Sequence, residues 1–139
     1  GELAGAHEGV GDLRYTTGDL RGALARYERA LAIRERLARA APRDDGMRRA
    51  LALVHTRLGD VKGLDGYPNL GDAGATLVHY RRALALREAS ARARPTDRAL
   101  AAELAQTRAN LGMQLRTVGR LAEAIDEGRR AVAGLEALA

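Results

Sequence analysis

The sequence predicts an all-α fold, a solenoid of three antiparallel helical hairpins built from six long helices. The main observation is an internal repeat: residues 18–35, GDLRGALARYERALAIRE, return at 71–88 as GDAGATLVHYRRALALRE and, more weakly, from residue 119. A second short motif precedes each copy: VGDL at 10–13, LGDV at 58–61 and LGMQ at 111–114. No stretch alternates apolar and polar residues as a strand would. Since a two-helix unit cannot bury its apolar stripe alone, we expect the units to stack.

The spacing of the repeated glycines gives the length of the unit. Gly11 and Gly59 are 48 residues apart, as are Gly71 and Gly119, whereas Gly59 and Gly112 are 53 apart. The second copy therefore carries five additional residues within 64–70, LDGYPNL, whose Gly, Pro and Asn favour a loop. The sequence favours a plain spacer there, with a contact loop as the alternative. We expect one domain over 1–139, with units of about 1–43, 44–95 and 96–139.

The first three helices are bounded by caps and prolines. One is expected over about 2–16, and a second over 20–41, where apolar residues recur every three to four positions before Pro42. Asp44 or Asp45 can cap the third, with Arg48 and Arg49 able to pair with them. The apolar stripe of the third helix is expected to be buried through Met47, Leu51, Val54, Leu58 and Val61.

The last three helices follow the same logic. One is expected over about 72–94, ending before Pro95, and the next is capped by Thr96 or Asp97. The buried stripe of that helix is expected to be Leu100, Leu104, Leu111 and Leu115. A final helix is expected from about residue 121 to the end of the chain.

Each copy also repeats a pattern of small and aromatic residues around its glycines. The positions are Gly11, Gly18, Ala23, Tyr27 and Ala30; Gly59, Gly71, Thr76, Tyr80 and Ala83; and Gly112, Gly119, Ala124, Gly128 and Ala131. This pattern resembles the tetratricopeptide repeat. The family's unit is about 34 residues, so the longer helices resemble the variety found in kinesin light chains. The sequence of residues 67–72 resembles that of repeat arrays that follow the catalytic domain of some bacterial serine/threonine protein kinases.

The resemblance implies a right-handed solenoid with a concave groove lined by the first helix of each unit. By equivalent position it assigns to the groove Glu8, Asp12, Tyr15, Thr56, Arg57, Asp60, Gln106, Asn110, Met113 and Arg116. Asp12 and Asp60 recur one repeat apart. They either bond to a neighbouring hairpin or turn, which the sequence favours, or form an acidic element that selects a basic or hydrogen-bond-donating segment. Together with Glu8 they would repel a partner's acidic tail.

The chain contains none of the common sequence motifs that indicate a catalytic site or a metal centre. There is no phosphate-binding loop with Lys, no His-Glu-x-x-His, no Gly-x-Ser-x-Gly and no cysteine. His7 and His55 occupy equivalent positions 48 residues apart, which favours packed structural histidines over metal ligands. We therefore expect no catalytic residue, no metal and no cofactor. The lack of a membrane-length apolar run and of a signal pattern predicts a cytoplasmic chain without a membrane partner, and the initial Gly suggests a fragment of a longer protein.

The positive charge is concentrated on the second helices. The net charge is +5, but 20–41 holds six arginines against two glutamates, whereas 1–16 holds one arginine against three acidic residues. A GC-rich genome and a solvated outer face are the favoured reasons. A phosphate-binding stripe is the alternative, although the aromatic residues that stack on single-stranded bases are missing.

These observations predict a non-catalytic interaction scaffold that takes a peptide or helical segment of another protein in its concave groove, as part of a larger regulatory or signalling protein. The alternative is an arginine-rich surface on the convex face that binds nucleic acid or another polyanion. A third possibility is self-association through the apolar ends of the array.

Overall fold

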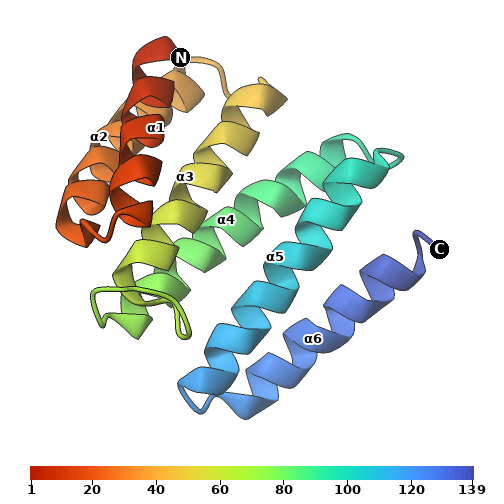
Figure 1. The fold of residues 1–139 in the computed structure, drawn as a ribbon. Helices are drawn as coiled ribbons and strands as arrows, with labels where there is room; N and C mark the ends of the chain where they lie inside the picture. Colours follow the sequence, from red (N-terminus) through yellow and green to blue (C-terminus); the bar gives the residue numbers. More distant parts are fainter.

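The computed structural model describes all residues from Gly1 to Ala139 and contains six α-helices and no strand (Figure 1). The helices are α1 (Glu2–Thr16), α2 (Leu20–Ala40), α3 (Asp45–Gly63), α4 (Ala73–Ala93), α5 (Arg98–Thr117) and α6 (Leu121–Glu136). The all-α prediction is confirmed. Only α6 ends clearly short of its predicted limit, because the last residues tighten into turns in which Leu138 and Ala139 donate to the carbonyls of Leu135 and Glu136.

Aspartates begin the four central helices. In each case the carboxylate accepts a hydrogen bond from the backbone amide three residues later, at 2.9 to 3.2 Å, and thereby satisfies an amide that has no partner within the helix. The capping residues are Asp19 for α2, Asp44 for α3, Asp72 for α4 and Asp97 for α5. Of the alternatives left open by the sequence, Asp45 and Thr96 are not the caps. Asp45 instead accepts from Arg48, while Arg49 reaches Glu103 on α5.

The repeated glycines allow the paired helices to approach closely. A Cβ atom on Gly11 would lie 2.5 Å from Cε1 of Tyr27, and one on Gly59 would lie 2.8 Å from the ring of Tyr80. Each tyrosine of α2 and α4 therefore packs on the glycine of the preceding helix. The turn glycine Gly18 has φ of +86°, a conformation that other residues adopt only with strain.

Each helix packs mainly on the next one in the chain, so that α1 and α6 lie at opposite ends of the molecule (Figure 1). One core cluster joins α2 to α3 through Ala23, Tyr27, Ala30, Val54, Leu58 and Val61. A second joins α4 to α5 through Leu77, Tyr80, Leu84, Leu111 and Leu115. The repeated small residues Ala23, Ala30, Ala83 and Ala131 are buried, whereas Ala124 is half-buried.

Burial stops short of what the sequence predicts at one edge of the core. Met47, Leu51 and Leu104 are half-buried rather than buried. Leu51 borders a shallow depression between α2 and α3 that also contacts Leu86 of α4, so solvent reaches this end of the stripe. None of the six helices combines the length and the apolarity that a membrane span requires.

Candidate binding site

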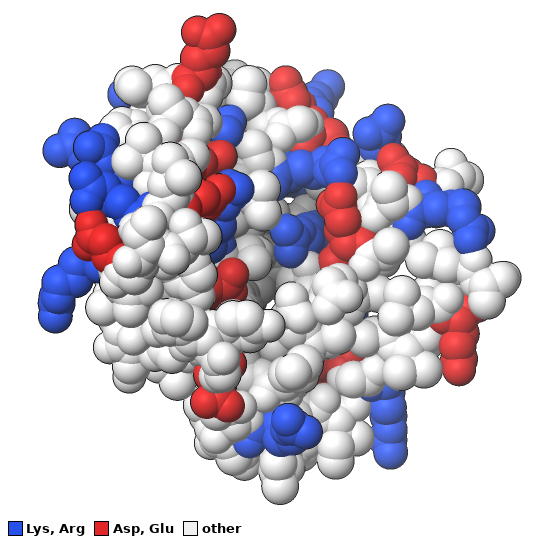
Figure 2. All heavy atoms as spheres, in the orientation of Figure 1, with Lys and Arg blue, Asp and Glu red and all other residues white.

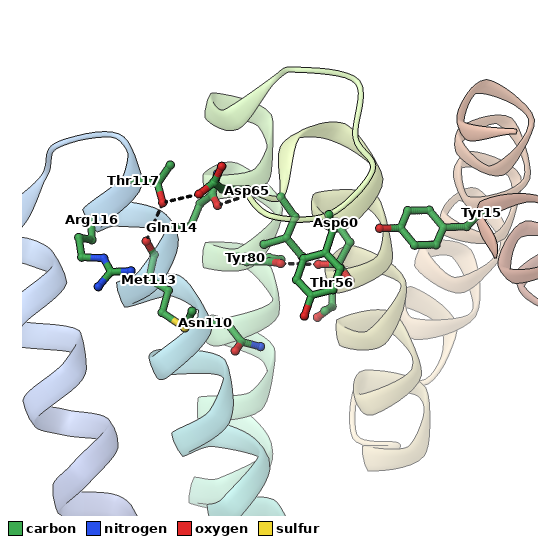
Figure 3. A pocket seen from close by; sticks show the side chains of 12 residues that line it. Tyr15, Thr56, Asp60, Asp65, Tyr80, Asn110, Met113, Gln114, Arg116 and Thr117 are labelled. Carbon is green, nitrogen blue, oxygen red and sulfur yellow. Dashed lines mark hydrogen bonds between the residues drawn. The ribbon is translucent and has the colours of Figure 1, made fainter. Parts of the chain in front are cut away.

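Six of the ten groove residues predicted from the sequence come together around one cavity of about 520 Å³, here called the central pocket. They are Tyr15 of α1, Thr56 and Asp60 of α3, and Asn110, Met113 and Arg116 of α5. Leu64, Asp65, Tyr67, Tyr80, Gln114 and Thr117 complete the wall (Figure 3). The pocket thus draws on α1, α3, α4 and α5 and on the 64–72 segment between α3 and α4.

The 64–72 segment follows a sharp exit from α3. Gly63 ends the helix against the backbone of Asp72, where a Cβ atom would lie 2.2 Å from the carbonyl oxygen, so no larger residue fits without displacing the segment. Asn69 closes the loop from within: its amide donates to the carbonyls of Leu64 and Tyr67 at 3.0 and 2.8 Å, and its oxygen accepts from the Gly71 amide at 2.7 Å. The segment is therefore a compact loop with its own hydrogen bonds.

The same segment is attached to the helices on both sides of the pocket. The Tyr15 hydroxyl of α1 donates to the Pro68 carbonyl at 3.2 Å. On α5, the buried Gln114, 1% exposed, donates to the Gly63 carbonyl at 3.0 Å and accepts from the Asp65 amide at 3.4 Å. The sequence favours a plain spacer at 64–70, but in the structure Leu64, Asp65 and Tyr67 form one wall of the central pocket. One signal in the sequence was available: Gln114 occupies the repeat position of the buried Val61, where an uncharged polar side chain needs a partner.

Tyrosine and carboxylate groups gather in the pocket, beside one cation, Arg116. Three of the four tyrosines in the chain, Tyr15, Tyr67 and Tyr80, line it together with Asp60 and Asp65. The Tyr80 hydroxyl donates to Asp60 Oδ1, as Figure 3 shows. Burial raises the pKa of Asp60 above its ordinary value, although the Tyr80 hydrogen bond and the charge of Arg57 oppose that rise. Burial, with the nearby Asp60 charge second, also raises the pKa values of Tyr15 and Tyr80.

Glu8, Asp12 and Arg57 lie outside the pocket, in an ion cluster that joins α1, α2 and α3. Glu8, only 8% exposed, accepts from Arg34 Nε at 2.7 Å and from Arg57 Nη1 at 3.3 Å. Arg57 Nη2 also donates to Asp12 Oδ2 at 2.9 Å. These three groups are therefore occupied within the protein, which repeat position alone could not reveal. The exposed Gln106 also lies outside the pocket and donates to Asn110 Oδ1 at 3.0 Å.

Asp12 and Asp60 make the same contact in successive units. Asp12 Oδ1 accepts from the Tyr27 hydroxyl at 2.7 Å, just as Asp60 Oδ1 accepts from Tyr80. The predicted bond to a neighbouring hairpin is present for Asp12, which accepts from Arg57 of α3, whereas Asp60 accepts from Tyr80 within its own hairpin. The two aspartates differ in their other surroundings. Oδ2 of Asp12 accepts a hydrogen bond from Arg57, whereas Asp60 lines the central pocket.

His7 and His55 each contact the second helix of their own hairpin, and His79 of α4 contacts α3. His55 Nδ1 lies 3.0 Å from His79 Nδ1, and His79 Nε2 lies 3.1 Å from the Lys62 ammonium. His7, at the equivalent position one unit earlier, lies with Nδ1 3.3 Å from Arg26 Nη1. The structure brings together no group of three His, Asp or Glu side chains suited to hold a metal ion.

Exposed arginines gather along α2. Arg21, Arg29 and Arg36 are spaced two helical turns apart, are exposed, and form no ion pair, whereas Arg14 pairs with Asp19 beside them. Basic side chains are prominent along this edge of the molecule in Figure 2. The edge carries positive charge without an aromatic partner.

Comparison with known protein families and curated proteins identifies no relative of the chain. No model of a known protein family matches the chain, and no curated protein matches it in sequence. The geometry of the chain itself therefore carries the functional argument.

Proposed function

We propose that the chain is a right-handed, tetratricopeptide-like solenoid whose central pocket receives a basic side chain from a segment of another protein. The repeated pattern of glycine, tyrosine and alanine, with a glycine–tyrosine contact in each of the first two units, supports the repeat family. In this proposal the array is the non-catalytic interaction part of a larger regulatory protein.

The observation that carries the proposal is the gathering of three tyrosines and two carboxylates around one pocket. Asp60 is a half-buried carboxylate of the pocket wall, and a carboxylate shielded from water attracts an incoming cation more strongly than an exposed one. Tyr15 and Tyr67 also line the pocket, and aromatic rings attract ammonium and guanidinium groups. Thr56 of α3 and Asn110 of α5, both in the pocket wall, can hydrogen-bond to the backbone of the bound segment.

A peptide-display selection against the protein tests this proposal without a known partner. Enriched peptides are expected to share a Lys or Arg, and replacing that residue by Met should abolish binding measured by calorimetry. Asp60→Asn should weaken the selected peptides by about tenfold or more, because it removes the charge while keeping an oxygen for Tyr80.

The matched control is Asp12→Asn. Asp12 occupies the same repeat position and accepts the same tyrosine hydrogen bond, but it lies outside the pocket. Its replacement should leave peptide affinity unchanged. Selected peptides without a basic residue, or equal losses in the two variants, would contradict the proposal.

Polyanion binding through the convex face is a second candidate, favoured by the unpaired arginines of α2. If it is correct, a single-stranded oligonucleotide should bind with an affinity that falls steeply as salt rises, because phosphate contacts release counterions. The triple variant Arg21→Gln/Arg29→Gln/Arg36→Gln should then lose the oligonucleotide and keep the selected peptides.

A further inference from the structure

The outer face of α6 is an uncovered apolar surface. Leu121, Ile125, Val132 and Leu135 are each at least half exposed, with Ile125 at 56% and Val132 at 55%. Together with Met113 of α5 they line a groove of about 490 Å³, here called the α6 face. Exposed apolar patches of this kind mark interaction surfaces.

The outer face of α1, at the other end of the molecule, is also apolar. Leu3, Val10 and Leu13 are exposed, Leu13 at 68%. Ala6 lies between them on the same side of the helix. These four residues are here called the α1 face. In a repeat array each unit packs on its neighbours, and in this structure nothing covers the α1 face or the α6 face.

The repeat register relates these two faces to contacts that exist inside the molecule. Leu121, Ile125 and Val132 lie 101 residues after Leu20, Leu24 and Leu31 of α2. Those three leucines pack against the core cluster that joins α2 to α3. The α6 face therefore repeats the surface on which α2 receives a following helix.

The α1 face repeats the other half of the same contact. Val10 and Leu13 lie 48 residues before Leu58 and Val61, which are completely buried in the cluster between α2 and α3. Ala6 likewise stands 48 residues before the buried Val54. The chain thus carries both complementary halves of a helix–helix contact that it already makes internally, one at each end.

We propose that the chain associates head to tail, with the α1 face of one copy packed on the α6 face of the next as α3 packs on α2. A single molecule cannot join its own two faces, because α1 and α6 lie at opposite ends of the molecule (Figure 1). The contact is heterologous, so each added copy presents a new α6 face and the assembly extends. Met113 lines both the α6 face and the central pocket, so the two sites adjoin on α5.

The charges around the two faces are compatible with this contact. The residues of both apolar stripes are uncharged. Within the molecule, Glu88 of α4 and Arg108 of α5 form an ion pair of 3.7 Å at the rim of their contact. The equivalent positions in the proposed contact are Glu136 and His7 of the next copy. Within the molecule, Arg57 of α3 pairs with Asp12 of α1. The equivalent positions in the proposed contact are Gly9 of the next copy and Met113, and both are uncharged. No like-charged pair is buried in this arrangement.

Two single variants and their mixture test the proposal. Leu13→Glu spoils the α1 face and Ile125→Glu the α6 face, and both side chains are exposed in the single molecule, so folding is expected to persist and is checked by circular dichroism. In sedimentation velocity the unsubstituted chain should grow in mass with concentration beyond a dimer. Each variant alone should be a monomer.

The mixture separates head-to-tail contact from its alternatives. Equal amounts of the two variants should form a one-to-one dimer that does not extend, because the intact α1 face of one meets the intact α6 face of the other. An unsubstituted chain that stays monomeric at every concentration would overturn the proposal. A monomeric mixture would also overturn it. So would a Leu13→Glu variant that still dimerises alone, which is what a symmetric α6–α6 contact predicts.

Discussion

His79 shows how the environment of one residue sets its charge. The Lys62 ammonium can only donate, so His79 Nε2 accepts and the neutral ring carries its proton on Nδ1. That proton points to Nδ1 of His55, 3.0 Å away. Burial, with the positive charge of Lys62 next and His55 and Arg82 following, lowers the pKa of His79 to about 4.

Stability is therefore expected to fall as the pH falls from about 6.5 to about 4, because the unfolded chain binds a proton at His79 that the folded chain does not. One proton changes the unfolding free energy by at most about 1.4 kcal/mol per pH unit. We expect less, since solvent reaches part of the ring. Urea unfolding across this range should show a shallower dependence in His79→Gln than in the unsubstituted chain.

Asp60 is expected to change the stability with pH in the direction opposite to His79. Its raised pKa gives a stability that is present at low pH and is lost as the pH rises through that pKa. The comparison is therefore best made in an Asp60→Asn background, where the slope assigned to His79 should become steeper. Identical slopes with and without the His79→Gln substitution would show that the ring does not stay neutral in the folded chain.

Single positions also mark the limit of sequence reasoning. The repeat correctly pairs Asp12 with Asp60 and His7 with His55, because equivalent positions share a face of the array. It cannot tell that Glu8 is held by Arg34 and Arg57, since those partners are specific to one unit. Four of the ten predicted groove residues fall outside the central pocket for such reasons.

Among the elements, the 64–72 segment depends most on a single side chain. Asn69→Ala removes two donated hydrogen bonds and one accepted bond. We expect a loss of about 2 kcal/mol in unfolding free energy, since each such bond contributes roughly 0.5–1.5 kcal/mol. Hydrogen exchange should accelerate in residues 64–72 and leave α1 and α2 unchanged.

Asn110→Ala is the matched control for this element. Asn110 also lines the pocket, but its side chain accepts only from Gln106 on its own helix, and alanine favours a helix. The stability should hardly change. A loss as large as that of Asn69→Ala would mean that pocket residues in general, rather than the loop, support the fold.

The helices could be predicted closely from the sequence because their signals are local. Capping aspartates, terminating prolines and apolar stripes all act within a few residues of the element they define. The role of the insert could not be predicted in the same way. Its anchors are Tyr15 and Gln114, which meet residues 49 to 53 positions away in the chain. The local sequence there predicts a loop but not what the loop touches.

At the scale of the whole molecule, packing is close to one-dimensional. The principal contacts run from each helix to the next, and ion pairs such as Arg57 with Glu8 and Arg81 with Glu123 link helices two apart. In such an array stability is approximately a sum of unit and nearest-neighbour contributions. A terminal helix is then held by one neighbour, whereas α3 and α4 are held by two.

The α6 helix is therefore expected to open before the rest of the chain. It buries only Ala131 fully, and no side chain caps its first turn. In native-state hydrogen exchange on dilute protein, its amides should exchange more than about tenfold faster than those of α3, which buries seven residues. Raising the concentration should then slow exchange in α6 and α1 together if the two faces meet head to tail. Exchange at one common rate in all six helices would instead mean that the array unfolds as a single unit.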